Sequence, residues 1–215
     1  MIGIFDSGVG GICAYREVQR LLPDEDIIYL ADRKNAPYGT KTQDEILALT
    51  SKNIKILRSA GASTVLIACC TASSVYQMLS PLEREVSIPI ITPAAMVAAS
   101  GEKITVIATR HTAGCKVFSK EIARLSSASV TEIAEQELVS LVEGGLRDGR
   151  VSREGKIYLG ALAERIKKTD ADTLILGCTH FSHLERELQK RLPGVRIVSP
   201  AREGAIEAAR KVGNT

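Results

Sequence analysis

Aromatic residues are scarce in this 215-residue chain: they make up 4% of it, and tryptophan is absent. Proteins that bind single-stranded nucleic acid commonly stack the bases on aromatic side chains, so this shortage disfavours such a role. Positive charge is not concentrated either, because the net charge is only +3 and basic residues such as Lys34 and Lys41 are scattered. Nucleic-acid-binding proteins typically carry a basic patch or stripe. We therefore expect no nucleic-acid partner.

Long apolar runs are also missing. No stretch approaches the roughly 20 residues that a membrane-spanning helix needs. The first residues, MIGIFDSGVGG, have neither the charged region nor the cleavage site of a signal peptide. The five cysteines are irregularly spaced and odd in number, which fits a reducing compartment better than a disulfide framework. These features predict a soluble cytoplasmic protein with no membrane partner.

Short apolar runs alternate with amphipathic stretches along the whole chain. Thr42 and Glu45 form a capping box that predicts a helix running to about Ala60, where Gly61 ends it. Alternating strands and helices predict an α/β fold with parallel sheets. The runs that we interpret as buried strands are Ile2–Phe5, Ile27–Leu30, Val65–Ala68, Ile88–Ile91, Ile104–Ala108, Leu174–Leu176 and Val195–Val198.

Two stretches of the chain are alike. Residues 64–71 read TVLIACCT and residues 173–180 read TLILGCTH, so Cys69 and Cys178 follow equivalent apolar runs. A weaker likeness relates FDSGVGG, after the first predicted strand, to IATRHTAG, which includes the end of the fifth. We predict two pseudo-symmetric α/β lobes with parallel sheets and an active site in the cleft between them. The first lobe comprises residues 1–91 plus 195–215, and the second comprises residues 92–194.

Reactive side chains gather just past the predicted strand ends. In open α/β sheets, ligands bind outside the carboxyl ends of the strands, so these side chains mark a candidate site. They are Asp6, Ser7, Cys69, Thr71, Thr109, Thr112, Cys178, Thr179 and His180.

The two matched cysteines suggest a particular chemistry. A racemase or epimerase needs a base on one face of a carbon and an acid on the other, and one thiol from each lobe would supply them. A thiol at a helix N-terminus has a lowered pKa, so we expect lowered values for Cys69 and Cys178. The substrate would be a small acid with an α-proton, whose carboxylates the helix N-termini and nearby hydroxyl groups would bind. Asp6 and His180 lie beside the turns and could tune the thiols or relay protons.

Two other interpretations have less support. A zinc site would use Cys178, His180 and His183 with Cys69 or Cys70, but this set lacks any established ligand spacing. The DSGVGG turn matches neither a Walker A loop nor a G-x-G-x-x-G fingerprint, which leaves nucleotide binding weakly supported. We therefore expect no bound metal.

A series of motifs extends over nearly the whole chain: FDSGVGG (Phe5–Gly11), APYGTKT (Ala36–Thr42), ACCTAS (Ala68–Ser73), ITPAA (Ile91–Ala95), ATRHT (Ala108–Thr112), LVEGG (Leu141–Gly145) and LGCTH (Leu176–His180). Their identity and order resemble those of glutamate racemases in the cofactor-independent aspartate/glutamate racemase superfamily. A set of ordered motifs is far more specific than any one of them.

The resemblance implies that Cys69 and Cys178 are the acid/base thiols, and that Asp6, His180 and Glu143 assist them. It implies interconversion of L- and D-glutamate without pyridoxal phosphate or metal, supplying D-glutamate for peptidoglycan. It also implies two α/β lobes with the C-terminal segment rejoining the first, and a homodimer, as in many members. The residues that match substrate-contacting positions are Ser7, Pro37, Tyr38, Gly39, Cys70, Thr71, Thr109, Thr112 and Thr179.

The chain departs from this family's pattern in three ways. Cys70 stands where the family usually has Asn, and a thiol is a poorer hydrogen-bonding group than an amide. Phe181 and Ser182 replace a Tyr-Pro pair, and the chain is shorter than the usual member. Alternative functions are therefore racemisation of aspartate or another small acid, or a binding or regulatory role in a homologue with impaired catalysis.

Overall fold

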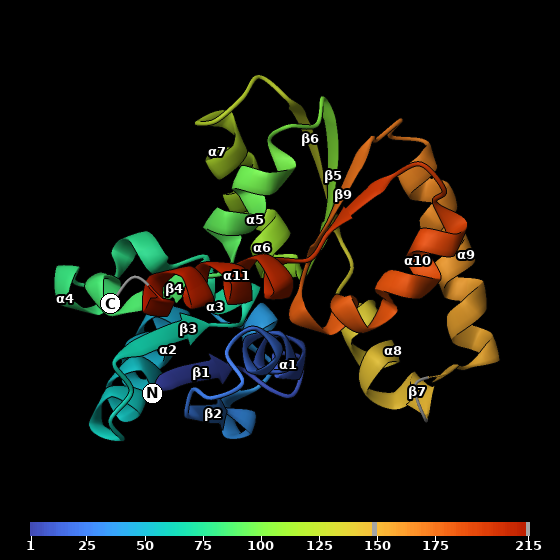
Figure 1. Cartoon of the computed structure of the whole chain (residues 1–215). Helices are drawn as coiled ribbons and strands as arrows, with labels where there is room; N and C mark the ends of the chain where they lie inside the picture. The colour runs from blue at the N-terminus through green and yellow to red at the C-terminus, as the bar shows by residue number, and fades with distance from the viewer. Residues whose placement is uncertain (148–149, 214–215) are drawn as a thin grey trace.

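The computed structural model describes residues 1–147 and 150–213, and the side chains of these residues except 145–147 and 150. Two four-stranded parallel sheets form the framework (Figure 1). The first sheet contains β1 (Ile2–Asp6), β2 (Ile27–Ala31), β3 (Thr64–Ile67) and β4 (Ser87–Pro89). The second contains β5 (Lys103–Ala108), β6 (Ser129–Ala134), β9 (Thr173–Gly177) and β10 (Arg196–Val198). A short antiparallel pair, β7 (Leu146–Arg147) and β8 (Arg150–Val151), lies apart from both.

The two sheets have the same topology. The first has the order β2-β1-β3-β4, and the second, followed from its opposite edge, has the order β6-β5-β9-β10. Strand β3 therefore corresponds to β9, and β1 corresponds to β5. These are the strands that precede the matched turns of the sequence. The predicted fold of two pseudo-symmetric α/β lobes with parallel sheets is confirmed.

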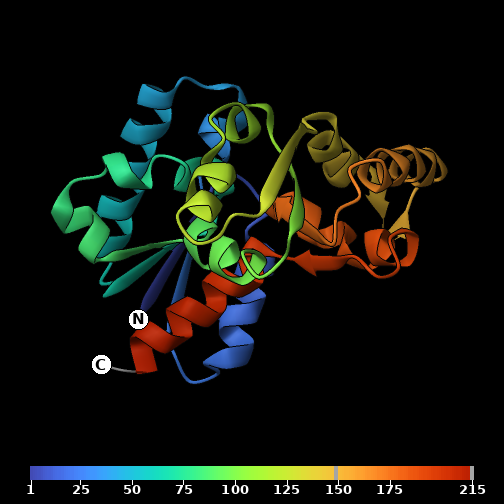
Figure 2. The same ribbon diagram turned by 90° about the horizontal axis from the view of Figure 1, so that it is seen from above.

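Helices connect the strands and cover the sheets (Figures 1 and 2). In the first half of the chain they are α1 (Ile12–Leu21), η1 (Arg33–Asn35), η2 (Tyr38–Thr40), α2 (Gln43–Ser59), α3 (Cys70–Ser73), η3 (Tyr76–Met78), α4 (Pro81–Glu85) and α5 (Ile91–Ala98), where η marks a 3₁₀ helix. In the second half they are α6 (Arg110–Gly114), α7 (Val117–Ala123), α8 (Glu137–Gly145), α9 (Arg153–Lys167), η4 (Thr179–Leu184), α10 (Glu185–Arg191) and α11 (Pro200–Gly213). None of the helices within the described residues combines the length and apolarity that crossing a bilayer requires.

Helix α2 begins and ends as its sequence predicts. The Thr42 hydroxyl accepts a hydrogen bond from the backbone N–H of Glu45, and the Glu45 carboxylate accepts one from the backbone N–H of Thr42. After the helix, Gly61 has a φ of +99°, a left-handed conformation that favours glycine. The reciprocal cap satisfies two backbone donors that the first turn of a helix leaves without partners.

The helices α5 and α11 are exchanged between the lobes. Helix α5 follows β4 of the first sheet but packs on α7 and β9 of the second lobe, whereas α11 follows β10 and packs on α1 (Figure 2). The two helices also pack against each other. We expected both the last strand and the last helix to rejoin the first lobe. That expectation was wrong for the strand, because β10 pairs with β9 in the second sheet.

One further strand prediction needs correction, and strand β6 was missed. We expected a strand over Ile88–Ile91, but β4 ends at Pro89, where the backbone N–H of Ile90 donates to the Ser73 hydroxyl, and Ile91 begins α5. Strand β6 was not predicted, because its sequence, SVTEIA, mixes polar and apolar residues. It lies at a sheet edge with partly exposed side chains, so it lacks the continuous apolar run of a buried strand.

A single apolar core joins the two lobes. Ile4 and Leu66 from the first sheet share one cluster of buried side chains with Val106 and Ile175 from the second. Each lobe also has a separate cluster on the other face of its sheet. The shared core fixes the positions of the two sheets, and hence of the turns at their carboxyl ends.

Candidate active site

The two matched cysteines line one cavity of about 280 Å³, with walls formed by both lobes. It lies at the carboxyl ends of β3 and β9, where parallel α/β sheets place their ligands. Its lining residues are Ser7, Gly8, Ala36, Pro37, Tyr38, Gly39, Cys69, Cys70, Thr71, Thr109, Gln136, Val139, Ser140, Glu143, Cys178, Thr179 and His180.

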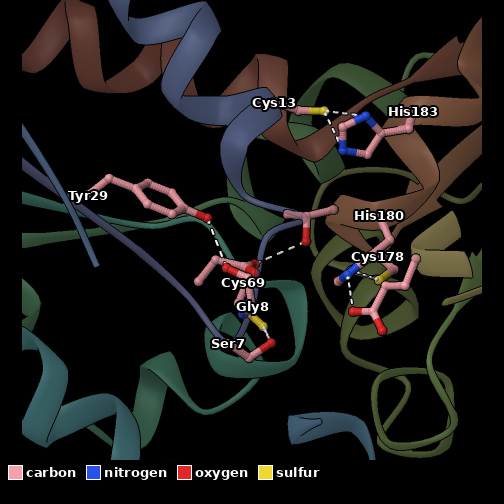
Figure 3. Close-up of polar contacts among 11 residues, drawn as sticks. Ser7, Gly8, Cys13, Tyr29, Cys69, Cys178, His180 and His183 are labelled. Carbon is pink, nitrogen blue, oxygen red and sulfur yellow. Dashed lines mark hydrogen bonds and ion pairs between the residues drawn. The ribbon is translucent and has the colours of Figure 1, made fainter. Parts of the chain in front are cut away.

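Cys69 occupies the N-cap position of α3, directly after β3. Its Sγ accepts a hydrogen bond from the backbone N–H of Ala72 at 3.5 Å and lies 3.5 Å from the Ser7 hydroxyl (Figure 3). Burial raises the pKa of the Cys69 thiol to about 11, and the negative charge of Asp6 acts in the same direction. The polar contacts of the thiol with Ser7 and with the Ala72 backbone N–H only partly oppose this.

Cys178 follows β9 and has a different neighbour. Its Sγ lies 3.7 Å from Nδ1 of His180, and Nε2 of the same ring lies 3.0 Å from a carboxylate oxygen of Glu143 (Figure 3). The thiol, the imidazole and the carboxylate thus form a chain of polar contacts. Burial also raises the pKa of the Cys178 thiol.

The expected lowering of the two thiol pKa values was wrong in sign. Helix α3 is only four residues long, and the element after Cys178 is the 3₁₀ helix η4. Such short elements supply a weak dipole compared with the desolvation of a nearly buried thiol, which disfavours the charged form. Cys69 is 5% exposed and Cys178 is 7% exposed. Burial therefore outweighs the effect of the helix ends on the pKa values of both thiols.

Asp6 lies beneath the cavity rather than on its wall. The residue is fully buried, and its carboxyl group accepts hydrogen bonds from the backbone N–H of Gly8 at 2.7 Å and the Thr179 hydroxyl at 3.0 Å. Burial raises the pKa of Asp6, and nearby His180 opposes that shift. Because Thr179 follows β9, this hydrogen bond connects the two lobes next to both cysteine turns.

The glycines of DSGVGG allow this close approach. A Cβ atom on Gly10 would lie 2.6 Å from Nδ1 of His180, and one on Gly11 would lie 2.6 Å from Cβ of Asp6. Both distances are below normal contact distances. Gly10 is therefore needed where the turn packs against the second lobe, and Gly11 where it packs against Asp6 of β1.

Three predicted threonines form a hydrogen-bonded triangle. The hydroxyl oxygen of Thr71 lies 3.1 Å from that of Thr109 and 3.2 Å from that of Thr112, and the latter two are 3.0 Å apart. Thr71 and Thr109 line the cavity, whereas Thr112 is fully buried behind them. The triangle spans the lobes and presents hydroxyl groups to the cavity.

The remaining predicted residues lie on the first-lobe wall. Pro37, Tyr38 and Gly39 line the cavity, and the Tyr38 hydroxyl donates to Asp32 at 2.6 Å. Cys70 is also on the wall, although it is only 2% exposed and packs into the core shared by the lobes. Burial raises the pKa of the Cys70 thiol well above its ordinary value.

The second-lobe wall includes residues that the sequence analysis missed. Gln136, Val139 and Ser140 lie between the end of β6 and the middle of α8. Their position follows from β6, which was itself not predicted. These residues could have been identified from the sequence because they lie close to Glu143, which is one turn further along α8. Ala36 and Gly8, which also line the cavity, lie beside predicted site residues.

One member of the proposed zinc set, His183, does not line the cavity with the others. His183 faces Cys13, with Nε2 3.4 Å from its Sγ, whereas His180 faces Cys178 (Figure 3). Among the residues whose placement the structure gives, no three His, Cys, Asp or Glu side chains are arranged to hold a metal ion. All five cysteines are free of disulfide bonds.

Comparison with known proteins shows which proteins the chain resembles. The Asp/Glu/hydantoin racemase family model matches residues 13–208. The chain is 36% identical to a glutamate racemase from Gloeothece citriformis over 217 residues, with 98% of this chain and 76% of that protein covered. It is 37% identical to one from Clostridium novyi over 218 residues, covering 98% of this chain and 83% of that protein.

Solved structures show the same relationship. The glutamate racemase isoform RacE1 from Bacillus anthracis has a TM-score of 0.89 and 31% identity, with 100% of this chain and 82% of that chain covered. The Escherichia coli glutamate racemase, solved with L-glutamate and an activator, has a TM-score of 0.76 and 31% identity, covering 97% and 80%. The family match, the sequence relatives and the shared fold agree: this chain belongs to the Asp/Glu/hydantoin racemase family.

Proposed function

We propose that this protein interconverts L- and D-glutamate by a two-thiol mechanism that uses no cofactor. The observation that carries the proposal is that Cys69 and Cys178, from topologically equivalent strand ends of two lobes, line one small cavity. Its sequence relatives at 36–37% identity are named glutamate racemases, which favours glutamate over other acids.

In this mechanism, the thiolate of one cysteine takes the α-proton of glutamate, which leaves a planar carbanion. The thiol of the other cysteine then donates its proton to the opposite face and becomes a thiolate. The product is the other enantiomer, and the two cysteines have exchanged protonation states. Reacting atoms must approach within about 3–3.5 Å, so the substrate Cα lies between the two sulfur atoms.

The raised thiol pKa values give the substrate a further role. A buried thiol is almost entirely neutral at pH 7 when its pKa is about 11, so little of Cys69 is present as thiolate. A substrate ammonium group entering the cavity favours the charged form of a nearby thiol, because opposite charges attract strongly at a desolvated site. Substrate binding therefore helps to generate the base.

The other predicted residues have distinct proposed roles. Ser7 supports Cys69 through its hydroxyl group, and His180 supports Cys178 with Glu143 behind it. Asp6 holds the Gly8 turn and Thr179 in place. The residues that form or support the substrate-binding wall are Pro37, Tyr38, Gly39, Cys70, Thr71, Thr109, Thr112 and Thr179.

The cellular role follows from the proposed reaction. D-glutamate is a precursor of peptidoglycan, so the enzyme would act in cell-wall synthesis and in maintaining cell shape. We place it in the cytoplasm, consistent with five free cysteines. We also propose that it functions as a homodimer, as implied by its resemblance to the family.

The test is racemisation in heavy water. Incubation with L-glutamate or D-glutamate should bring the circular dichroism signal to zero, with one deuterium incorporated at Cα. Parallel incubations with L- and D-aspartate test the alternative substrate. Absence of both signal decay and deuterium exchange with glutamate would overturn the proposed function, and activity on aspartate alone would reassign the substrate.

A further inference from the structure

Gln136 is a polar residue on the cavity wall that the catalytic mechanism does not use. It lies two residues after the end of β6, in the turn that leads into α8. Its backbone is held by the preceding residue, Glu135, whose N–H donates to the carbonyl of Ala108 at 2.7 Å. The Glu135 side chain, 1% exposed, accepts a hydrogen bond from the Tyr158 hydroxyl and pairs with Arg165. These contacts of Glu135 hold the backbone of Gln136 in place, and the Gln136 side chain extends from it.

The orientation of the Gln136 amide is determined by its partner. Its Oε1 lies 3.3 Å from the backbone nitrogen of Arg110, at the start of α6. A backbone N–H can only donate, so the amide oxygen, and not the NH₂ group, must face it. The NH₂ group points elsewhere, and it donates to no protein acceptor among the backbone and side-chain atoms that the structure describes. Two N–H donors are thus available on the wall of the cavity.

The same amide lies where the lobes meet. A Cβ atom on Gly39 would come 2.8 Å from Oε1 of Gln136 and 3.0 Å from Cβ of Thr109. Gly39 belongs to the first lobe, whereas Gln136 and Thr109 belong to the second. The hydrogen-bond partner of the Gln136 amide, Arg110, lies outside both cysteine turns. This part of the wall is therefore distinct from the part that holds the thiols.

The position of Gln136 identifies the substrate group that it reaches. The thiols must flank Cα, which keeps the ammonium and α-carboxylate groups beside the cysteine turns. Only the side-chain carboxylate extends away from Cα toward another part of the wall. Resting on the proposed function, we infer that Gln136 is a specificity-determining residue whose NH₂ group donates a hydrogen bond to the side-chain carboxylate of glutamate. Aspartate, which is one methylene shorter, gains less from this donor.

The test compares substitutions at Gln136 by steady-state kinetics. Gln136→Met keeps the length of the side chain but removes both donors, and we expect the KM for glutamate to rise about ten- to a hundredfold. The kcat should change less than about threefold, because this contact is made equally in the ground state and the transition state. The ratio of kcat/KM for glutamate to that for aspartate should fall with the rise in KM. Gln136→Glu places a carboxylate against the substrate and should raise the KM further.

Glu137→Ala, at the exposed first residue of α8, is the matched control and should leave all constants unchanged. Thermal unfolding of each variant verifies that the fold is retained. An unchanged KM and an unchanged glutamate preference in Gln136→Met would overturn the inference while leaving the proposed racemisation intact. If the wild-type protein racemises no acidic amino acid, calorimetric titration of wild type and Gln136→Met with D-glutamate still tests the contact. Equal affinities would overturn it.

Discussion

The turns at Cys69 and Cys178 occupy equivalent places in two sheets of the same topology, yet their surroundings differ. Cys69 receives a backbone N–H and contacts the hydroxyl of Ser7. Cys178 instead contacts His180, which has a carboxylate partner, and burial raises its pKa beyond that of Cys69. The pseudo-symmetric fold places two thiols, but it does not make them equal acids.

This difference has a defined kinetic meaning. The two enantiomers have equal free energies in water, so kcat/KM must be the same in both directions whatever the enzyme provides. An inequality between the cysteines therefore appears not in kcat/KM but in the individual proton-transfer steps, and so in kcat, in KM and in their isotope effects. Substitutions that alter one turn at a time can reveal it.

The largest expected effect is the loss of either thiol. Cys69→Ser and Cys178→Ser should each reduce racemisation about a thousandfold, because a hydroxyl group is a much weaker acid than a thiol and cannot exchange the proton at neutral pH. Circular dichroism measures the loss. Each variant should still exchange deuterium into the enantiomer that the remaining thiol deprotonates. Cys115→Ser, whose hydroxyl can still donate to the Thr112 carbonyl, is the control and should retain activity. A tenth or more of wild-type activity in either test variant would contradict the two-thiol mechanism.

The next largest effect is expected from substituting the residue that contacts each cysteine, His180 for Cys178 and Ser7 for Cys69. His180→Asn should lower kcat/KM about ten- to a hundredfold, since it removes the polar partner of Cys178. Proton transfer at Cys178 then becomes slower relative to transfer at Cys69. The primary deuterium isotope effect on kcat should increase for the enantiomer that Cys178 deprotonates and change less for the other. Ser7→Ala should show the opposite preference, because Ser7 contacts Cys69. If the isotope effect on kcat is the same for the two enantiomers in both variants, then His180 and Ser7 do not each assist a different cysteine.

A smaller effect distinguishes the thiols in the absence of substrate. Cys69 should react with iodoacetamide faster than Cys178, because its pKa is raised less. Below its pKa, the fraction of a thiol present as thiolate increases about tenfold per pH unit, so both rates should rise steadily between pH 7 and pH 10. Tandem mass spectrometry of the alkylated peptides separates the two sites, with urea-unfolded protein as the reference. A plateau near pH 8 would contradict the raised pKa values.

The smallest effect compares two tyrosine–carboxylate pairs whose carboxylates, Asp32 and Glu135, directly follow the equivalent strands β2 and β6. Tyr38 donates to Asp32, and Tyr158 donates to Glu135. Tyr38→Phe should lower the free energy of unfolding by about 1.5 kcal/mol, and Tyr158→Phe by about 1 kcal/mol, because Tyr38 is more deeply buried. Urea unfolding measures both, and a larger loss in Tyr158→Phe would contradict this ranking.

Most strands were predictable because they are continuous apolar runs. Those containing Ile4, Val106 and Leu174 agree with the structure to within one residue at each end. Strand β6 was not predictable in this way, since an edge strand need not be apolar on both faces. Missing β6 also meant missing Gln136 on the cavity wall. One undetected strand thus concealed part of the candidate site.

The sequence by itself determined that two cysteines follow matched strands, that a glycine-rich stretch follows Asp6, and that Thr42 begins a helix. These features depend on residue type and local spacing. Only the tertiary structure decided that α11 covers the first lobe while β10 stays in the second sheet, and that both cysteines line one cavity. It also decided the sign of the thiol pKa shifts. The physical reason is desolvation: the N-terminal turn of a helix can be predicted from sequence, but the burial that outweighs it depends on side chains far away in the chain.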